Sequence, residues 1–293
     1  MCVTDYDIGS ETASFVSLDE LRRVAALSRA QMATENFPVA LRLLPKEPRD
    51  RLTRVYAFAR FVDDVGDEAT GDRLALLDIV ERDLRALPAG RSELPPVQGV
   101  RPLVADGVEL APFLDLIEAN RVDQRVARYD RFDDLLEYCR LSAAPVGRIV
   151  LAVAGVRDTG LTSRSDAVCT ALQVLEHCQD VGEDARAGRV YLPAEELAAA
   201  DVTDADLTAD TTSGALRRVV ARQVRRADEL LAEGPALVRA LHGWARVAVA
   251  GYVAGGRATS HALRRAGYDV LAGTVRPSSA RTAGYAARLW AGR

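Results

Sequence analysis

The sequence predicts an all-α protein built as a single domain. Long stretches rich in Ala, Leu, Arg and Glu carry apolar residues three and four positions apart, which is the period of an amphipathic helix. The alternation of apolar and polar residues that marks a strand is weak throughout. No repeat of about 20–50 residues divides the chain. We therefore expect one helical domain over residues 1–293, with 1–16 and 277–293 mobile in part.

Eight segments carry the helical signal. In chain order they are 19–32, 50–69, 72–87, 110–127, 131–157, 164–187, 213–241 and 243–266. Ser17 with Glu20 resembles a capping box, and Ser163 precedes the helix that holds the second of two acidic stretches. These signals place both acidic stretches on helices.

Proline-containing breaks separate the helices at 45–48, at 88–102 and near 277. The break at 88–102 reads either as a domain linker or as a surface loop, and we favour the loop because neither side resembles a self-contained α/β unit. The one segment expected to be extended is RVYLP, residues 189–193, where a proline follows Val190 and Tyr191 closely.

Composition narrows the class of protein. A net charge of −4 and a pI near 5.6 argue against a nucleic-acid-binding protein. The N-terminus lacks the basic start and apolar run of a secretory signal, and no stretch approaches 18 uncharged apolar residues. The four cysteines show no metal-ligand spacing. We expect a reduced, cytoplasmic protein, with peripheral contact to the inner face of the membrane if its substrate is a lipid.

The stretch RFVDDVGDE, residues 60–68, places four carboxylates within six positions. Asp63 and Asp67 are four residues apart, so a helix carries them on one face, one turn from each other. Like charges at this spacing destabilise a helix by a few tenths of a kcal/mol. Taken alone, the stretch fits either a solvated acidic surface or a binding site.

A second stretch, QVLEHCQDVGED at 173–184, repeats the arrangement. Tyr56, Arg60, Asp63 and Asp67 lie at offsets 0, 4, 7 and 11, and the same offsets separate Gln173, His177, Asp180 and Asp184. Apolar residues flank both stripes, which indicates that they face an interior. Carboxylates gathered there need positive counter-charge. Mg²⁺ supplies it, taking one or two carboxylates per ion and completing its shell with water and phosphate oxygens.

At this point the sequence resembles the squalene and phytoene synthase family of all-α enzymes, which join prenyl diphosphates head to head. YAFARFVDDVGDE resembles the family's first aspartate-rich motif, and QVLEHCQDVGEDARAGRVYLP resembles the second. YCRLSAAPVG at 138–147 and ALRRAGYDVLAG at 262–273 extend the likeness over nearly the whole chain. The resemblance implies the isoprenoid synthase fold, with helices around a central cavity.

Three details resemble the branch that forms hydroxysqualene in the bacterial hopanoid pathway. They are ENFPVA at 35–40, APVG at 144–147, and Gln179 directly before Asp180. That branch converts presqualene diphosphate to hydroxysqualene by ionisation, cyclopropylcarbinyl rearrangement and capture by water. The resemblance thus implies several Mg²⁺ ions bound with the substrate diphosphate, no NADPH, and hand-off of the product to neighbouring pathway enzymes.

The resemblance also implies roles for individual residues. The metal ligands are Asp63, Asp67, Asp180 and Asp184. The catalytic residues that line the cavity are Tyr138, Gln173 and Glu176. The substrate-binding residues are Asn36, Phe37, Tyr56, Arg60, Gln179, Arg189 and Tyr191, of which Arg60 and Arg189 hold the diphosphate. From the residues alone, Arg60 could instead pair with Asp64, and Tyr138 could be a core aromatic.

Three positions depart from the family pattern. Glu176 stands where relatives have Asn, and its carboxylate could bind metal or orient the attacking water. His177 replaces an apolar residue and reads either as a base or as a buried structural histidine. Gly256 occupies the place of a tyrosine in dehydrosqualene-forming relatives, and the missing ring is expected to leave room for water.

Three other functions stay open beside hydroxysqualene formation. The first is head-to-head condensation of two farnesyl diphosphates to presqualene diphosphate, squalene or dehydrosqualene. The second is a different activity on the same scaffold. The third is a non-catalytic lipid-binding relative, against which the intact aspartate pairs argue.

Overall fold

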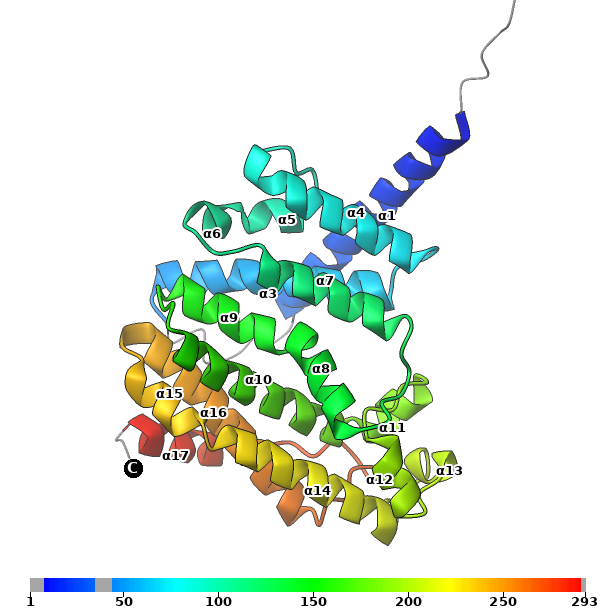
Figure 1. The fold of residues 1–293 in the computed structure, drawn as a ribbon, viewed down its shortest axis with the longest axis vertical. Coiled ribbons are helices and arrows are strands. Elements are labelled where there is room, and N and C mark those ends of the chain that lie inside the picture. The colour runs from blue at the N-terminus through cyan, green and yellow to red at the C-terminus, as the bar shows by residue number, and fades with distance from the viewer. Residues whose placement is uncertain (1–7, 35–43, 291–293) are drawn as a thin grey trace, which may run out of the picture. The chain divides into compact units, whose positions relative to one another are not determined.

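The computed structural model describes residues 8–34 and 44–290, and these form an all-α fold, as the sequence predicts (Figure 1). The elements are α1 (Ile8–Thr34), α3 (Lys46–Asp67), α4 (Arg73–Ala86), η1 (Leu87–Ala89), α5 (Pro95–Gly99), α6 (Arg101–Ala105), α7 (Ala111–Asp123), α8 (Phe132–Ser142), α9 (Ala144–Val153), α10 (Thr159–Gln179), α11 (Val181–Arg186), α12 (Ala194–Ala199), α13 (Asp204–Leu207), α14 (Gly214–Leu231), α15 (Gly234–Ala240), α16 (Gly243–Arg265) and α17 (Ser279–Trp290). Within the described ranges no helix is long and apolar enough to span a bilayer.

The described residues group into two compact units. Unit 1 is drawn from Met1–Pro38 and Asp50–Gln124, and unit 2 from Val39–Arg49 and Arg125–Arg293. The first aspartate-rich motif therefore belongs to unit 1 and the second to unit 2. The single domain remains a prediction.

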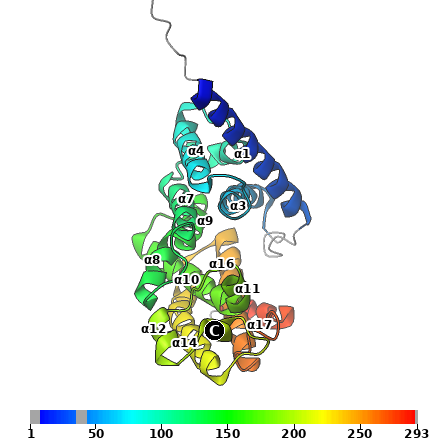
Figure 2. The same cartoon turned by 90° about the vertical axis from the view of Figure 1, so that its right-hand side faces the viewer.

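The core of unit 1 forms around α3. Phe58, Phe61 and Val62 are fully buried on one side of this helix. Phe58 packs edge-to-face on Phe113 of α7, with ring centroids 5.2 Å apart. Helix α1 lies against α4 and α5 (Figure 2). The carboxylate-bearing end of α3 is thus held on a rigid apolar base.

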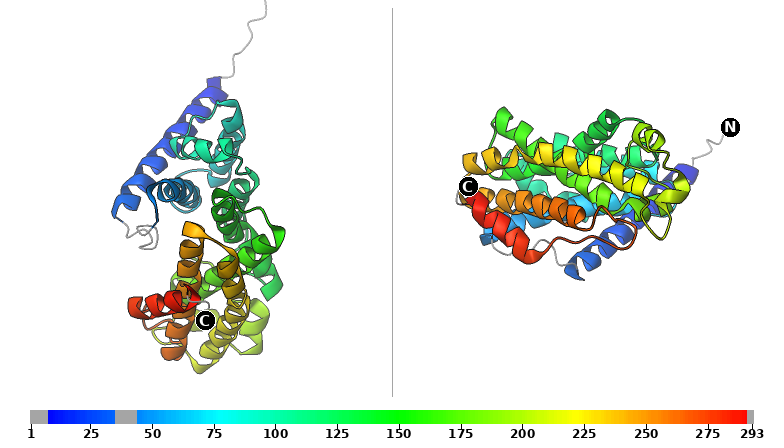
Figure 3. Two further views of the ribbon diagram at one scale, coloured as in Figure 1. Left: turned by 90° about the vertical axis from the view of Figure 1, so that its left-hand side faces the viewer. Right: turned by 90° about the horizontal axis from the view of Figure 1, so that it is seen from below.

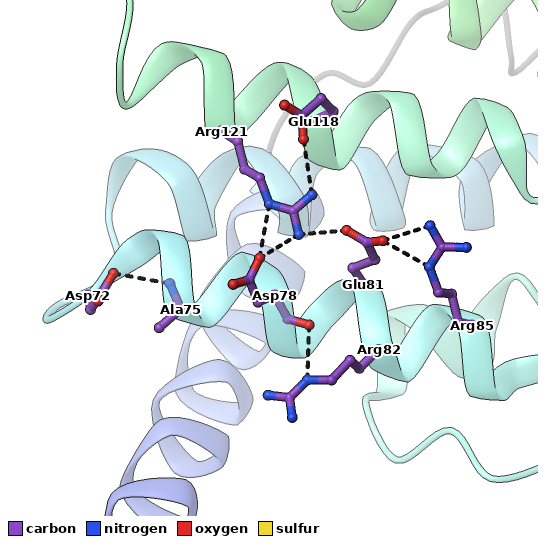
Figure 4. A network of polar contacts seen from close by, with 8 residues as sticks. All are labelled: Asp72, Ala75, Asp78, Glu81, Arg82, Arg85, Glu118 and Arg121. Atoms are coloured by element: carbon purple, nitrogen blue, oxygen red, sulfur yellow. Dashed lines mark hydrogen bonds and ion pairs between the residues drawn. The ribbon is translucent and has the colours of Figure 1, made fainter.

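A buried arginine joins α4 to α7 (Figure 4). The guanidinium of Arg121 lies 2.7 Å from a carboxylate oxygen of Asp78, 2.6 Å from Glu81 and 3.1 Å from Glu118. Its side chain is only 10% exposed, so the three carboxylates compensate a charge that water hardly reaches. This network fixes the position of α7 along α4.

The break at 88–102 is part of unit 1 rather than a linker. The carboxylate of Asp83 accepts hydrogen bonds from the Ser92 hydroxyl at 2.7 Å and from the backbone amides of Glu93 at 2.7 Å and Leu94 at 3.1 Å. Leu94 and Val97 are fully buried. Because apolar residues recur along this segment and are buried, it forms η1, α5 and α6 instead of an open loop.

In unit 2, α10 packs against α8, α9, α14, α15 and α16 (Figure 1). The predicted helix 131–157 is in fact two helices, because Pro145 lacks an amide proton and cannot continue the turn before it. Helix α10 begins before Ser163, since the Asp158 carboxylate accepts the Leu161 amide at 2.8 Å and caps the helix there. The predicted helix 164–187 is also divided, at Asp180.

Two further predictions, one about a helix start and one about the C-terminal segment, are wrong. Ser17 lies inside α1 rather than at its start, and Glu20 binds Arg23 and the amide of Thr70 instead of capping the helix. Residues 279–290, where no helix was predicted, form α17 against α16.

Candidate active site

The first carboxylate pair lies at the end of α3. Asp63 and Asp67 are four residues apart on the helix, and both side chains reach solvent-accessible space. The neighbouring Asp64 takes the buried side and is 5% exposed. The acidic stretch is therefore divided between two faces of α3, with Asp63 and Asp67 on the accessible one.

Asn120 on α7 contacts this pair. Its amide Nδ2 donates to Asp63 Oδ1 at 3.0 Å and to the Leu116 carbonyl at 3.2 Å. Although Asp63 keeps accessible surface, the protein atoms packed around it displace much of the bulk water, and this desolvation raises the pKa of its carboxyl to about 6. The bond from Asn120 opposes the shift because it favours the ionised form. Asn120 thus holds one oxygen of Asp63 and leaves the other available.

The close approach of α7 to α3 depends on Gly66. A Cβ at this position would lie 2.2 Å from Oδ1 of Asn120. Gln124, one turn after Asn120, donates its amide Nε2 to the Gly66 carbonyl at 2.9 Å. Asn120 and Gln124 were not predicted as site residues, although Asn120 does follow Phe113, Leu116 and Ile117 along the apolar stripe of α7.

Arg60 occupies the other side of α3. Its Nε donates to Asp64 Oδ1 at 2.8 Å and its Nη2 to Gln31 Oε1 at 2.9 Å. The sequence placed Arg60 beside Asp63 and Asp67, but the i,i+4 spacing brings its guanidinium to Asp64, which was the alternative interpretation. Tyr56, one turn earlier, is half-buried. Asn36 and Phe37 lie outside the described residues.

The second carboxylate group lies where α10 passes into α11. The amide of Asp184 donates to the Asp180 carbonyl at 2.8 Å, so the two residues stay one turn apart across the break between the helices. Burial and the Asp180 charge raise the pKa of Asp184 to about 7, against the opposing effect of Arg189. Burial and Asp180 also raise the pKa of Glu176. Three carboxylates here disfavour one another's ionisation.

A cluster of aromatic side chains packs beside this carboxylate group. The Tyr191 ring stacks on His177 with centroids 3.8 Å apart and 10° between the planes, and Tyr138 lies 5.7 Å from Tyr191. Tyr191 is held by an extended segment, as the sequence predicted, because the Val190 amide donates to the Ala127 carbonyl at 2.8 Å. Tyr138 and Tyr191 are both buried in this cluster, and their roles toward the substrate stay predictions.

His177 is a buried neutral histidine. Burial lowers its pKa to about 3. One ring nitrogen lies 3.4 Å from the amide nitrogen of Gln173 and the other 3.9 Å from Asp184 Oδ2. The structure therefore favours the structural interpretation, with Tyr191 and Gln173 as neighbours. Gln179 also makes a structural contact, since its side-chain amide donates a hydrogen bond to the Val275 carbonyl.

A pocket of about 210 Å³ opens beside the second carboxylate group. Val146, Leu172, Leu237 and Val249 supply apolar lining from α9, α10, α15 and α16, and Gln173 with Glu176 lies at the polar part. Cys169 also lines it, but burial raises the pKa of its thiol to about 11. The pocket thus combines apolar walls with one carboxylate and no reactive thiolate.

Gly256 does not leave an opening for water. A Cβ there would lie 2.7 Å from Cδ2 of Leu172 and 3.1 Å from the methyl groups of Leu231. These two leucines fill the space that the sequence interpretation assigned to a missing tyrosine ring. The glycine instead permits α16 to pack closely on α10 and α14.

The donor atoms suit a hard divalent cation. Two pairs offer carboxylate oxygens, Asp63 with Asp67 and Asp180 with Asp184. Burial and the repulsion within each pair raise the pKa of Asp63 and Asp184. A bound cation would relieve this repulsion. Across residues 8–34 and 44–290, no three side chains of the ligand types converge as a closed metal site. An ion held by either pair would therefore complete its shell from water and a ligand's phosphate oxygens.

Comparison with known proteins defines the class. The squalene/phytoene synthase family model matches residues 30–282, so the chain belongs to this family and is an enzyme that processes isoprenoid diphosphates. It is 36% identical to the hydroxysqualene synthase of Zymomonas mobilis over 82% of this chain and 81% of that one, and 38% identical to the hydroxysqualene synthase of Rhodopseudomonas palustris over 68% and 69%. A solved squalene synthase, HpnC from Alicyclobacillus acidocaldarius, is 40% identical and superposes with a TM-score of 0.76, covering 85% of this chain and 96% of that one.

Proposed function

We propose that this enzyme converts presqualene diphosphate and water to hydroxysqualene and diphosphate. The observation that carries the proposal is the similarity to hydroxysqualene synthases over most of both chains. The pocket of unit 2 supports it, because an apolar chamber with a carboxylate at its polar part suits a hydrocarbon cation that ends in a reaction with water.

Substrate binding would use both carboxylate groups. In unit 1, Asp63 and Asp67 would hold Mg²⁺ and, through it, diphosphate oxygens. In unit 2, Asp180 and Asp184 would do the same. Mg²⁺ bound there supplies Lewis acidity that draws negative charge onto the leaving diphosphate. Arg189, whose charge already acts on Asp184, would contact phosphate oxygens. Arg60 is engaged by Asp64 and Gln31, so we assign the phosphate contact to Arg189 first.

Ionisation breaks the carbon–oxygen bond, and the electron pair leaves with the diphosphate. The resulting cyclopropylcarbinyl cation rearranges while the walls of Val146, Leu172 and Val249 exclude nucleophiles. Water then forms the new carbon–oxygen bond, and its proton passes to the Glu176 carboxylate. Gln173 lies three residues before Glu176 on α10 and lines the same pocket, so its amide orients that water. No reductant enters the balance.

Product analysis tests the proposal. Purified protein with Mg²⁺ is given presqualene diphosphate or farnesyl diphosphate, each with and without NADPH, and the extracted products are identified by mass spectrometry. We expect hydroxysqualene from presqualene diphosphate without NADPH. Absence of turnover of presqualene diphosphate both with and without NADPH would contradict the proposal.

Condensation of two farnesyl diphosphates is the second candidate, and the likeness to a structure named squalene synthase favours it. Consumption of farnesyl diphosphate in the same experiment would support it. A requirement for NADPH would indicate squalene as the product, whereas hydroxysqualene formed without NADPH assigns the terminating step to water.

A further inference from the structure

Charge is distributed very unevenly along the chain. Residues 242–293 contain eight arginines and a single acidic residue, Asp269, which is a net charge of +7 in a chain whose total is −4. The first 241 residues therefore carry −11. Separation of this kind favours an oriented encounter with an anionic partner.

Six of these arginines lie on two helices, α16 with Arg246, Arg257, Arg264 and Arg265, and α17 with Arg281 and Arg288. Helix α17 packs along α16 (Figure 3). At one end, the Arg246 guanidinium lies 4.9 Å from the centroid of the Trp290 ring and donates to the Trp290 carbonyl at 3.0 Å. At the other end, burial and the charges of Arg281, Arg265 and Arg264 lower the pKa of His261. The two helices thus run antiparallel with cationic side chains at both ends.

Most of these arginines lack an acidic partner. Arg265, Arg276, Arg281 and Arg288 are exposed, and none forms an ion pair with a carboxylate in the part of the chain that the structure describes. Arg264 is different, because it pairs with Asp228. We call the four exposed arginines together with Trp290, which lies on the opposite flank of α17 from Arg281 and Arg288, the C-terminal basic face.

The C-terminal basic face also exposes aromatic surface. Trp290 is 54% exposed, more than any other large hydrophobic side chain among the described residues. On α17, Arg281 and Arg288 are seven residues apart with the half-buried Tyr285 between them, so all three follow one stripe of the helix. Arginine beside Trp and Tyr is the composition of helices that lie at a lipid headgroup layer.

We propose that the C-terminal basic face docks the protein on an anionic phospholipid surface. Charge complementarity identifies the partner, and the exposed indole favours a bilayer over a nucleic acid. The placement suits an enzyme for polyisoprenoids, because α15 and α16, against which α17 packs, also line the apolar pocket through Leu237, Val249 and Tyr252. Docking itself does not depend on which reaction the enzyme catalyses.

Vesicle sedimentation tests the proposal. The full-length protein is mixed with vesicles of phosphatidylcholine containing 30% phosphatidylglycerol, or of phosphatidylcholine alone, at about 0.1 M salt, where charges are screened over roughly 10 Å. We expect binding to the anionic vesicles only, weakened by added salt. Arg281→Gln with Arg288→Gln should lower the partition coefficient at least about tenfold, given the usual contribution of arginines near an anionic surface. Trp290→Ala should lower it further.

The matched control is Arg218→Gln with Arg225→Gln. These two arginines are also exposed and seven residues apart on one helix, α14, and neither forms an ion pair with a described carboxylate. The control should bind vesicles as the wild-type protein does. Equal loss in both double variants, equal binding to neutral vesicles, or retention on double-stranded DNA in place of vesicles would overturn the proposal. Circular dichroism spectra of all variants verify that they are folded.

Discussion

Asn120 donates a hydrogen bond to Asp63 across 3.0 Å, joining two helices whose residues are 57 positions apart in the chain. The contact exists because Gly66 has no side chain to occupy the space of the Asn120 amide. One carboxylate oxygen of Asp63 is thereby oriented by protein, which is the arrangement that precise metal coordination requires. Asn120 is accordingly a positioning residue for Asp63.

Replacing Asn120 by Leu should weaken Mg²⁺ binding by about 10–100-fold, the usual effect of losing a group that orients a ligand. The measurement is Mn²⁺ binding followed by electron paramagnetic resonance, together with the Mg²⁺ dependence of the rate. Gln98→Leu, which removes an amide bonded to the Ser92 carbonyl, is the control and should bind Mn²⁺ normally. Unchanged Mn²⁺ affinity in Asn120→Leu would assign Asn120 to packing alone.

Two adjacent glycines of α16 should respond oppositely to alanine. A Cβ at Gly255 meets no atom within 4 Å, so Gly255→Ala should raise the free energy of unfolding by about 0.5–1 kcal/mol through reduced backbone entropy. Gly256→Ala should lower it by about 1–3 kcal/mol, because its Cβ would collide with Leu172. Urea unfolding measures both. Equal effects would mean that α16 does not pack on Leu172 as described.

The carboxyl groups should make the metal-free protein more stable in mild acid. The pKa of Asp63 is raised to about 6 and that of Asp184 to about 7, from an ordinary value of 3.8. The folded state therefore keeps protons that the unfolded chain releases, and this contribution to stability is lost as the pH rises from about 4 to 7. Urea unfolding across this range should show a smaller pH dependence in Asp63→Asn with Asp184→Asn. An unchanged pH dependence would contradict the raised pKa values.

Glu176→Gln should separate ionisation from water capture. The variant keeps the shape of the side chain but cannot accept the proton of water, so we expect hydroxysqualene formation to fall by roughly 100-fold or more. Diphosphate release should fall less, and elimination products should replace the alcohol. Parallel assays of diphosphate and of extracted products measure the ratio. A proportional loss of both would show that Glu176 serves substrate binding or ionisation instead.

Removing one carboxylate of the second group tests the metal assignment. Asp180→Asn should reduce turnover by at least about 100-fold with the fold intact, because the proposed metal would supply several kcal/mol of transition-state stabilisation. Glu183→Gln removes an exposed carboxylate nearby and should keep near-normal activity. Chelation of divalent ions should abolish the activity of the wild-type protein, and Mg²⁺ should restore it. Near-normal turnover in Asp180→Asn would refute the assignment.

The sequence predicts those features that depend on helix periodicity. Asp63 and Asp67 lie one turn apart because both belong to α3. Asp180 and Asp184 also lie one turn apart, although the chain passes from α10 into α11 between them. The pairing of Arg60 with Asp64 is equally local, and the role of Arg60 at the substrate stays a prediction.

Features that depend on packing between distant segments could not be read in this way. Asn120 reaches Asp63 only because α7 approaches Gly66, although a polar residue on the apolar stripe of α7 was a usable signal. Helix α17 is too short to be stable alone and forms against α16. Because its stability depends on this packing, the sequence of 279–290 by itself carries only a weak helical signal. The leucines beside Gly256 come from α10 and α14, which explains why the expected opening is absent.

The most direct test of the proposed reaction is turnover of presqualene diphosphate in ¹⁸O-labelled water, with Mg²⁺ and without NADPH. We expect hydroxysqualene that carries one ¹⁸O atom and an equal amount of diphosphate without label, because water attacks carbon after the carbon–oxygen bond has broken. Label in the diphosphate, or the absence of an alcohol product, would contradict capture of the cation by water.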